Sequence, residues 1–265
     1  MGAATGAAAS SFVASQATPP VTLEEFFRQI CVVMTQVDPC AAGAGFSYFQ
    51  KAAFELPLIS STFSGAVLAA VGGLEPRARY PMLAAFALIG LAATAGVAHY
   101  ALEGIFAEGS DVAAQLSLAA AAHRQLTVMA RAGMSLLGFG AVHTFDTGLT
   151  RGLQRHSSAV GLAVAACVVA GLVNADLRVL VMAPGGVLLA ACGTASLWVV
   201  ASVAALVGSE LLKVPAVFDA AAHGLAPEDA VHVCTAFGFM FLIIAIAQVT
   251  RESPEESSKG KKKGE

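Results

Sequence analysis

Five long stretches of the chain carry no charged side chain, and each is about as long as a membrane-spanning helix. They cover residues 56–74, 80–102, 157–175, 187–209 and 231–250. An α-helix needs about 20 consecutive, mainly apolar residues to cross the hydrocarbon core of a bilayer. Only 12% of all residues are charged, whereas a water-soluble domain carries roughly 25%. The sequence therefore predicts an all-α protein, a polytopic transmembrane helix bundle.

One of these stretches is part of a longer uncharged segment, residues 179–209. This segment is too long for one straight span, and the sequence Pro-Gly-Gly at residues 184–186 interrupts it. Proline and glycine end or kink helices. We therefore predict a membrane helix over residues 187–209, preceded by an interfacial lead-in at residues 179–183.

A sixth span depends on residues 112–145, which are mainly apolar but include His123, Arg124 and Arg131. Because positions seven apart nearly superpose on a helix, both arginines lie on one polar stripe, with Ser117 and Ser135. Such a helix spans the bilayer if the stripe faces the bundle interior, or it lies at the interface with the arginines among the headgroups. We predict a span, which gives about six in total, within a range of five to seven. Arg124 and Arg131 are our candidates for binding an anion or a lipid headgroup.

The two ends of the chain differ from this apolar centre. Thr22 and Glu25 form a capping box, and apolar side chains follow at helical spacing, which predicts an N-terminal amphipathic helix. A weak seventh span over residues 29–50 is the alternative. We expect a disordered N-terminal tail (1–21), an amphipathic or interfacial helical segment (22–55), the transmembrane bundle (56–250) and a polar, lysine-rich C-terminal tail (251–265).

The C-terminal tail suggests a cellular compartment. Lys262 and Lys263 occupy the fourth and third positions from the end of the chain. This placement resembles the dilysine retrieval signal of resident endoplasmic reticulum membrane proteins, which a receptor reads on a cytosolic terminus. A merely solubilising tail is the alternative. The resemblance implies the endoplasmic reticulum membrane, with the C-terminus in the cytosol.

The basic residues do not support this orientation when six spans are assumed. With both termini in the cytosol, eight basic residues fall on the cytosolic side and five on the other. Basic residues in short loops carry the most weight in setting orientation. Four of them then lie in short loops on the wrong side, namely Arg77, Arg79, Arg151 and Arg155. The sequence leaves the orientation open.

Few side chains are candidates for chemistry. His143 and Asp146 share a helix face, and His99 lies in a neighbouring predicted span, so the three form a weak candidate for a polar cluster. The chain contains no nucleotide-binding loop and no nucleophile motif. We therefore predict no catalytic residue, no cofactor and no metal site.

Composition and pattern together favour a non-catalytic multi-pass membrane protein, acting in membrane organisation or as a subunit of a membrane complex. A transporter or channel for a small or anionic solute or a lipid is the alternative, using the polar stripe of residues 112–145. A lipid-modifying enzyme built on the weak polar cluster comes third. The expected partners are the bilayer and other membrane proteins or a second copy of the chain, which would pack on helix faces of small residues such as Ala204 and Gly208. The small net charge of −3 predicts no nucleic-acid partner.

Overall fold

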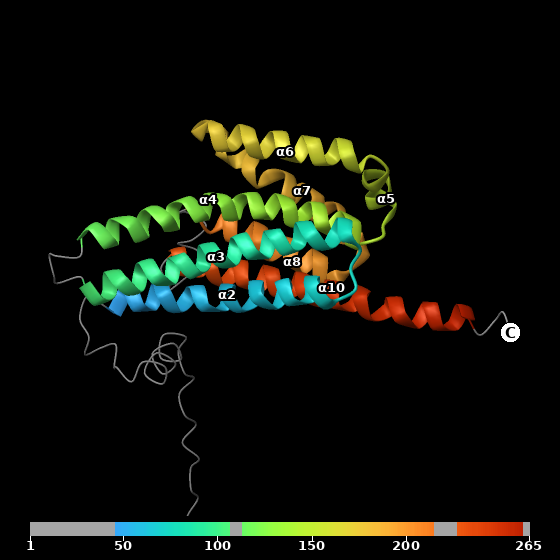
Figure 1. The fold of residues 1–265 in the computed structure, drawn as a ribbon, viewed down its shortest axis with the longest axis horizontal. Helices are drawn as coiled ribbons and strands as arrows, with labels where there is room; N and C mark the ends of the chain where they lie inside the picture. The colour runs from blue at the N-terminus through green and yellow to red at the C-terminus, as the bar shows by residue number, and fades with distance from the viewer. Residues whose placement is uncertain (1–45, 107–112, 215–226, 262–265) are drawn as a thin grey trace, which may run out of the picture. The chain divides into compact units, whose positions relative to one another are not determined.

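The structure, a computed structural model, describes residues 46–106, 113–214 and 227–261. The described residues are almost entirely helical and include no strand, which confirms the all-α prediction. In chain order (Figure 1) the elements are α2 (Phe46–Val71), α3 (Pro76–Phe106), α4 (Ala113–Thr144), α5 (Gly148–Arg155), α6 (Ser157–Val173), the 3-10 helix η4 (Ala175–Val181), α7 (Ala183–Ala191), the 3-10 helix η5 (Gly193–Ala195), α8 (Leu197–Leu211) and α10 (Pro227–Lys261).

Three of the described helices are long and apolar enough to cross a membrane. They are Lys51–Val71, Pro76–Glu103 and Asp229–Arg251. The pair Gly148–Arg155 and Ser157–Val173, bent by 84°, would make a fourth if it counts as one span. The structure therefore supports a membrane-embedded helix bundle, but it does not confirm about six spans.

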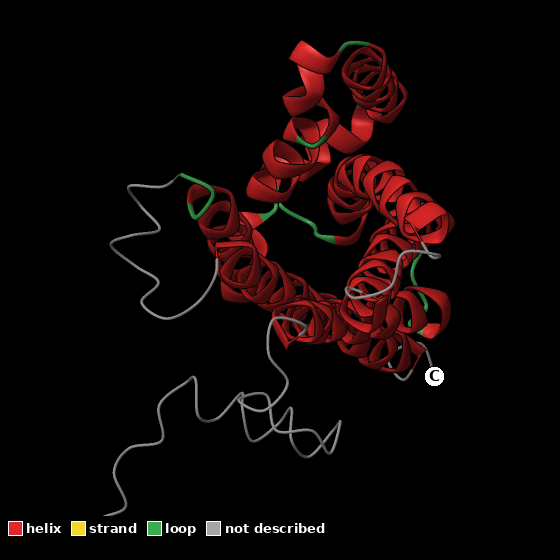
Figure 2. Cartoon of the chain, turned by 90° about the vertical axis from the view of Figure 1, so that its left-hand side faces the viewer, coloured by secondary structure: helices red, strands yellow, loops and turns green. Residues whose placement is uncertain are grey.

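Helices α2, α3, α4 and α10 pack side by side along most of their lengths (Figures 1 and 2). The turn between α2 and α3 needs a backbone with φ of +74° at Gly73, which glycine adopts without strain, and Pro76 then starts α3, as proline commonly does at a first helical position. Phe86 of α3 fills the space over Gly65 of α2 and meets the ring of Phe239 of α10 edge to face. Such close contacts fix the helices at one depth relative to one another.

The structure divides the segment 179–209 at a different place from the one predicted. Helix α7 runs through the Pro-Gly-Gly sequence and ends at Ala191, η5 follows, and α8 begins at Leu197. Ser196 caps α8 by accepting a hydrogen bond from the backbone N–H of Trp198, as serine does at helix starts. The prediction of one membrane helix over residues 187–209 is therefore wrong: Ser196 starts a new helix in the middle of it.

The break adds a reversal of chain direction. Helix α7 packs on α4 through Gly185, which contacts Met134 and Gly138, and in Figure 1 the two helices run in the same general direction. Helix α8 then runs against α10, since Trp198 meets Phe241 and Leu206 meets Gly238. The segment predicted as one membrane helix thus contains two shorter apolar helices, neither of which is among the three long candidate spans.

The predicted regions at the two ends lie partly beyond the described residues. The N-terminal tail, residues 22–45 of the amphipathic segment, and both residues of the dilysine sequence fall outside. Helix α2 starts at Phe46 and continues across residue 55, and α10 continues through the first part of the C-terminal tail to Lys261.

Candidate functional site

A buried carboxylate lies between α2 and its neighbours. Glu55 is only 2% exposed, and its Oε1 atom lies 3.6 Å from Nε2 of His232 on α10. Gly96 of α3 provides the room, because a Cβ atom there would meet Oε1 of Glu55 at 2.6 Å and the His123 ring of α4 at 3.0 Å. An ionisable group at this depth costs free energy, which makes it a candidate for function.

Aromatic and imidazole rings surround this carboxylate from α3 and α4. The His123 ring lies 5.7 Å from His99 and 5.7 Å from Tyr100, centroid to centroid, and the Lys51 ammonium lies 5.7 Å above Tyr100. The Nδ1 atoms of His99 and His123 are buried and have no hydrogen-bond partner among the described residues. We call Glu55, His99, Tyr100, His123 and His232 the Glu55 cluster.

The Glu55 cluster is suited to holding or passing a proton, since carboxylate and imidazole groups both take up protons. A metal site is not indicated: no group of three or more His, Cys, Asp or Glu side chains in the described ranges could hold a metal ion. Of this cluster, only His99 was a candidate for chemistry from the sequence, and His123 was noted only as a polar residue of the segment 112–145. Glu55 directly precedes the apolar stretch that starts at residue 56, whereas α2 starts ten residues before that stretch and places Glu55 inside the bundle.

The structure does not bring His99, His143 and Asp146 together. His99 lies beside His123, near the start of α4, and His143 lies near the end of the same helix. Twenty residues of α-helix separate these two levels by roughly 30 Å. The Nε2 atom of His143 instead lies 3.0 Å from Oγ of Ser157.

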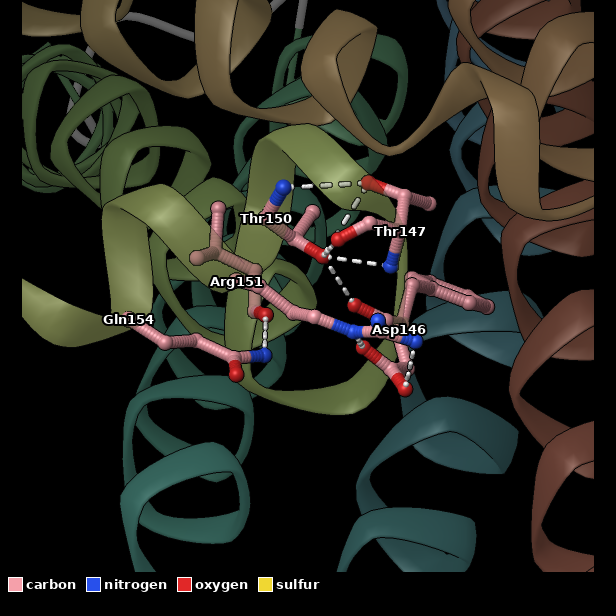
Figure 3. Close-up of polar contacts among 7 residues, drawn as sticks. Asp146, Thr147, Thr150, Arg151 and Gln154 are labelled. Carbon is pink, nitrogen blue, oxygen red and sulfur yellow. Dashed lines mark hydrogen bonds and ion pairs between the residues drawn. The ribbon is translucent and has the colours of Figure 1, made fainter.

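Asp146 belongs to a hydrogen-bonded corner between α4 and α5 (Figure 3). Its carboxylate accepts two hydrogen bonds from Arg151, at 2.6 and 2.9 Å, which lower the pKa of Asp146 below its usual value. The buried Thr150 hydroxyl donates to the carbonyl oxygen of Phe145 at 2.7 Å and accepts from the N–H of Thr147. Asp146 therefore helps to fix a turn.

Basic side chains gather at one end of the bundle. One pocket brings together the α2–α3 turn (Val71 to Glu75), the end of α4 (His143 and Thr144) and residues Val249 and Thr250 of α10. Arg77 and Arg79 follow this turn, Arg151 and Arg155 lie on α5 after the end of α4, and Arg251 follows Thr250. We call this the arginine end; the Glu55 cluster lies toward the opposite end. The sequence-based assignment with six spans placed Arg77, Arg79, Arg151 and Arg155 on the side opposite to the C-terminal tail.

Arg124 and Arg131 occupy different depths on α4. Arg124 is exposed and follows His123, near the end opposite to the arginine end. Arg131 is partly exposed and lies one turn before Ser135. Gly133 packs on Ala85 and Ile89 of α3, so Arg131 lies near the middle of the candidate span Pro76–Glu103.

The broken segment packs against α4 just beside Arg131. The Ser135 hydroxyl donates a 2.6 Å hydrogen bond to the carbonyl oxygen of Val181, the last residue of η4. Gly185 of α7 lies directly on the backbone of Met134 and Gly138. The polar stripe of α4 and the Pro-Gly-Gly sequence, two separate features of the sequence, therefore meet in the structure.

Comparisons with protein-family models, with curated proteins and with solved structures found no match for this chain.

Proposed function

We propose that this chain is a non-catalytic multi-pass integral membrane protein that acts in membrane organisation or as a subunit of a membrane complex. The observation that carries the proposal is Arg131. It is partly exposed at mid-depth of the neighbouring α3 span, and it makes no ion pair or hydrogen bond with any described residue.

An unpaired guanidinium at this depth needs a partner from outside the described chain. A cationic side chain at the centre of a membrane helix costs about 3 kcal/mol in insertion experiments, and more by other measures. From mid-span, each end of α3 is roughly 20 Å away, which is farther than an arginine side chain reaches toward the headgroups. An acidic or hydrogen-bonding group of a second membrane protein would remove this cost.

The exposed face of α8 offers a second contact for such a partner. Ala204 is exposed, and the position of a Cβ on Gly208 has nothing within 4 Å. Small residues four apart allow another helix to approach closely in a bilayer. By contrast, Gly96 and Gly171 already pack against this chain's own residues.

The test is co-purification of the full chain from membranes in mild detergent, with Arg131→Leu compared with Arg124→Leu. We expect Arg131→Leu to lose the bound partner, or the second copy of the chain, while the protein remains folded. Arg124→Leu should retain it, because Arg124 lies nearer the bundle end. Equal retention by both variants would contradict the proposal.

A transporter or channel is the second candidate, and one observation favours it. Half-helices that end at mid-membrane next to charged residues form the substrate sites of several transporter folds, and the η4–α7 junction lies one turn from Arg131. In a cysteine-free background, an Arg131→Cys thiol would react with a membrane-impermeant maleimide if an aqueous path reaches it. A cysteine placed at residue 109, in a loop, is the positive control and should be labelled from one side of the membrane. If this control is labelled and the thiol at residue 131 is not, the result counts against transport.

We also propose that the arginine end faces the cytosol. Basic residues favour the cytosolic side of membranes, and the structure brings Arg77, Arg79, Arg151, Arg155 and Arg251 to one end. The lysine-rich C-terminus follows from that same end. If α7 and α8 each cross the membrane, the four loop arginines and the C-terminal tail share one side, in agreement with this orientation.

The endoplasmic reticulum remains our proposed compartment, on the strength of the dilysine resemblance and a cytosolic C-terminus. Replacing Lys262 and Lys263 with serine should move the protein to later compartments, as seen by fluorescence microscopy. Replacing Lys259 and Lys261 in the same way is the matched control. An unchanged reticular pattern in the first variant would remove the argument for retrieval.

A further inference from the structure

A pocket of about 680 Å³ opens at the arginine end, where α3, α4, α5 and α6 meet. Arg77 comes from the first turn of α3 and Arg155 from the last turn of α5, so side chains 78 positions apart in the chain line the same space. His156, Ser158 and Gln154 add polar groups, and Pro81, Phe139 and Ala159 form an apolar wall. Charged donors on one side and apolar groups on the other suit an amphiphilic or anionic ligand.

The charge in this pocket is not balanced by nearby acids. No aspartate or glutamate lines it, and neither Arg77 nor Arg155 makes an ion pair with a described residue. Of the acids at this end, Asp146 binds Arg151 through both carboxylate oxygens, and Glu75 lines the other pocket described above. Two arginines without an ion pair to a described acid therefore line one cavity.

The walls of the pocket are held by hydrogen bonds that leave both arginines available. The Gln154 amide donates to the carbonyl oxygen of Val142 at 2.6 Å, and Ser157 Oγ lies 3.0 Å from His143 Nε2. These two contacts tie α5 and the start of α6 to the end of α4. Neither contact uses Arg77 or Arg155, so both arginines that line the pocket remain available to a ligand.

We propose that this pocket binds a phosphate group, with Arg77 and Arg155 as the principal ligands and His156 and Ser158 as further donors. Guanidinium groups hold phosphate oxygens through paired, charge-assisted hydrogen bonds, which makes arginine the usual residue at such sites. The phosphate can belong to a membrane lipid headgroup or to a soluble phosphate compound. The apolar wall and the exposed Leu162 on the following turn of α6 would lie beside the acyl chains in the first case.

The experiment measures binding to the purified full chain in a neutral detergent, with two probes. Short-chain phosphatidic acid presents the phosphate on a lipid, and inorganic phosphate presents it in water; phosphatidylcholine of the same chain length is the reference lipid. The test variant is Arg77→Gln with Arg155→Gln. The matched control is Arg79→Gln, because Arg79 lies two residues from Arg77 but donates to the hydroxyl of Tyr80 and does not line the pocket.

We expect the double variant to raise the dissociation constant for the bound probe by about tenfold or more, because two charge-assisted contacts are lost. Arg79→Gln should change this dissociation constant by less than about twofold. Binding of phosphatidic acid alone assigns the site to a lipid headgroup, and binding of inorganic phosphate as well assigns it to soluble phosphate compounds. The proposal is overturned if neither probe binds more tightly than phosphatidylcholine, or if Arg79→Gln weakens binding as much as the double variant. Circular dichroism melting in the same detergent checks that each variant is folded.

Discussion

Glu55 lies in the sequence Ala-Phe-Glu-Leu-Pro, where an apolar side chain would cost no desolvation. A buried pair of ionisable side chains rarely adds stability, because the loss of hydration offsets the attraction between them. The fold nevertheless leaves space for this carboxylate at Gly96 and places His232 beside it. The stability of the bundle therefore does not explain the pair, which points to a role in function.

The two residues should depend on each other energetically. His232→Ala leaves the buried Glu55 side chain without this partner, so we expect a loss of about 2 kcal/mol in the free energy of unfolding. In a Glu55→Gln background the same substitution should cost about 1 kcal/mol, because the pair is already changed. Denaturation in detergent measures this double-mutant cycle. The control is His143→Ala, whose effect on the free energy of unfolding should be additive with that of Glu55→Gln. Additivity for His232→Ala would show that the pair is not coupled.

The ion pair of Asp146 and Arg151 gives a pH dependence of known sign. Because Arg151 lowers the pKa of Asp146 in the folded protein, the pair stabilises the fold above the ordinary pKa of aspartate, about 3.9. This contribution disappears as the pH falls through the lowered value. We expect Asp146→Asn to melt slightly below the wild type at pH 7, and the difference in melting temperature to shrink as the pH falls below about 3.9. A difference that does not shrink with falling pH would show that Asp146 acts through something other than its charge.

At the scale of elements, the contact between α4 and α7 depends on glycine. A Cβ atom at Gly185 would collide with the backbone carbonyl of Met134, whereas one at Gly186 would meet nothing within 4 Å. Gly185→Ala should therefore cost about 2 kcal/mol by overpacking. Gly186→Ala should be neutral or should stabilise by about 0.5 kcal/mol, because it restricts the unfolded chain. Thermal unfolding in detergent compares the two, and equal melting temperatures would contradict the packing described.

The elements also show how far the sequence was informative. The apolar stretches 56–74, 80–102 and 231–250 predicted three helices correctly, because a long uncharged run in this composition permits little else. Their limits were less accurate: α2 begins at Phe46 and α3 at Pro76, since charged residues can remain helical beyond the membrane. The prediction of one helix over residues 187–209 was wrong because an uncharged residue such as Ser196 can cap a helix without interrupting an apolar run.

The candidate sites were harder to predict than the helices. His99, Arg124 and Arg131 were identified because a polar side chain in an apolar helix is conspicuous in the sequence. Their neighbours Glu55 and His232 lie at the ends of apolar runs, where a polar residue is expected anyway. Which of these residues meet depends on the direction of each helix, and the break at α7 and α8 changes that direction without any charge to mark it.

At the scale of the whole molecule, helix direction determines which loops share a side of the membrane. Residues 107–112, which join α3 to α4, follow from the end opposite to the arginine end, and the turn at Asp146 belongs to the arginine end. If the arginine end is cytosolic, an N-glycosylation acceptor inserted at residue 109 should be modified and one inserted at residue 146 should not. A gel shift after endoglycosidase treatment reads this out. Modification at residue 146 alone would reverse the orientation.

Helix α10 does not stop at the last apolar residue. It continues from Arg251 to Lys261, and ten residues of helix add roughly 15 Å along its axis. If Asp229–Arg251 crosses the bilayer, as its length and composition allow, this helical extension carries Lys261 away from the lipid surface. A receptor that reads the proposed dilysine signal would then meet the chain at a set height above the headgroups.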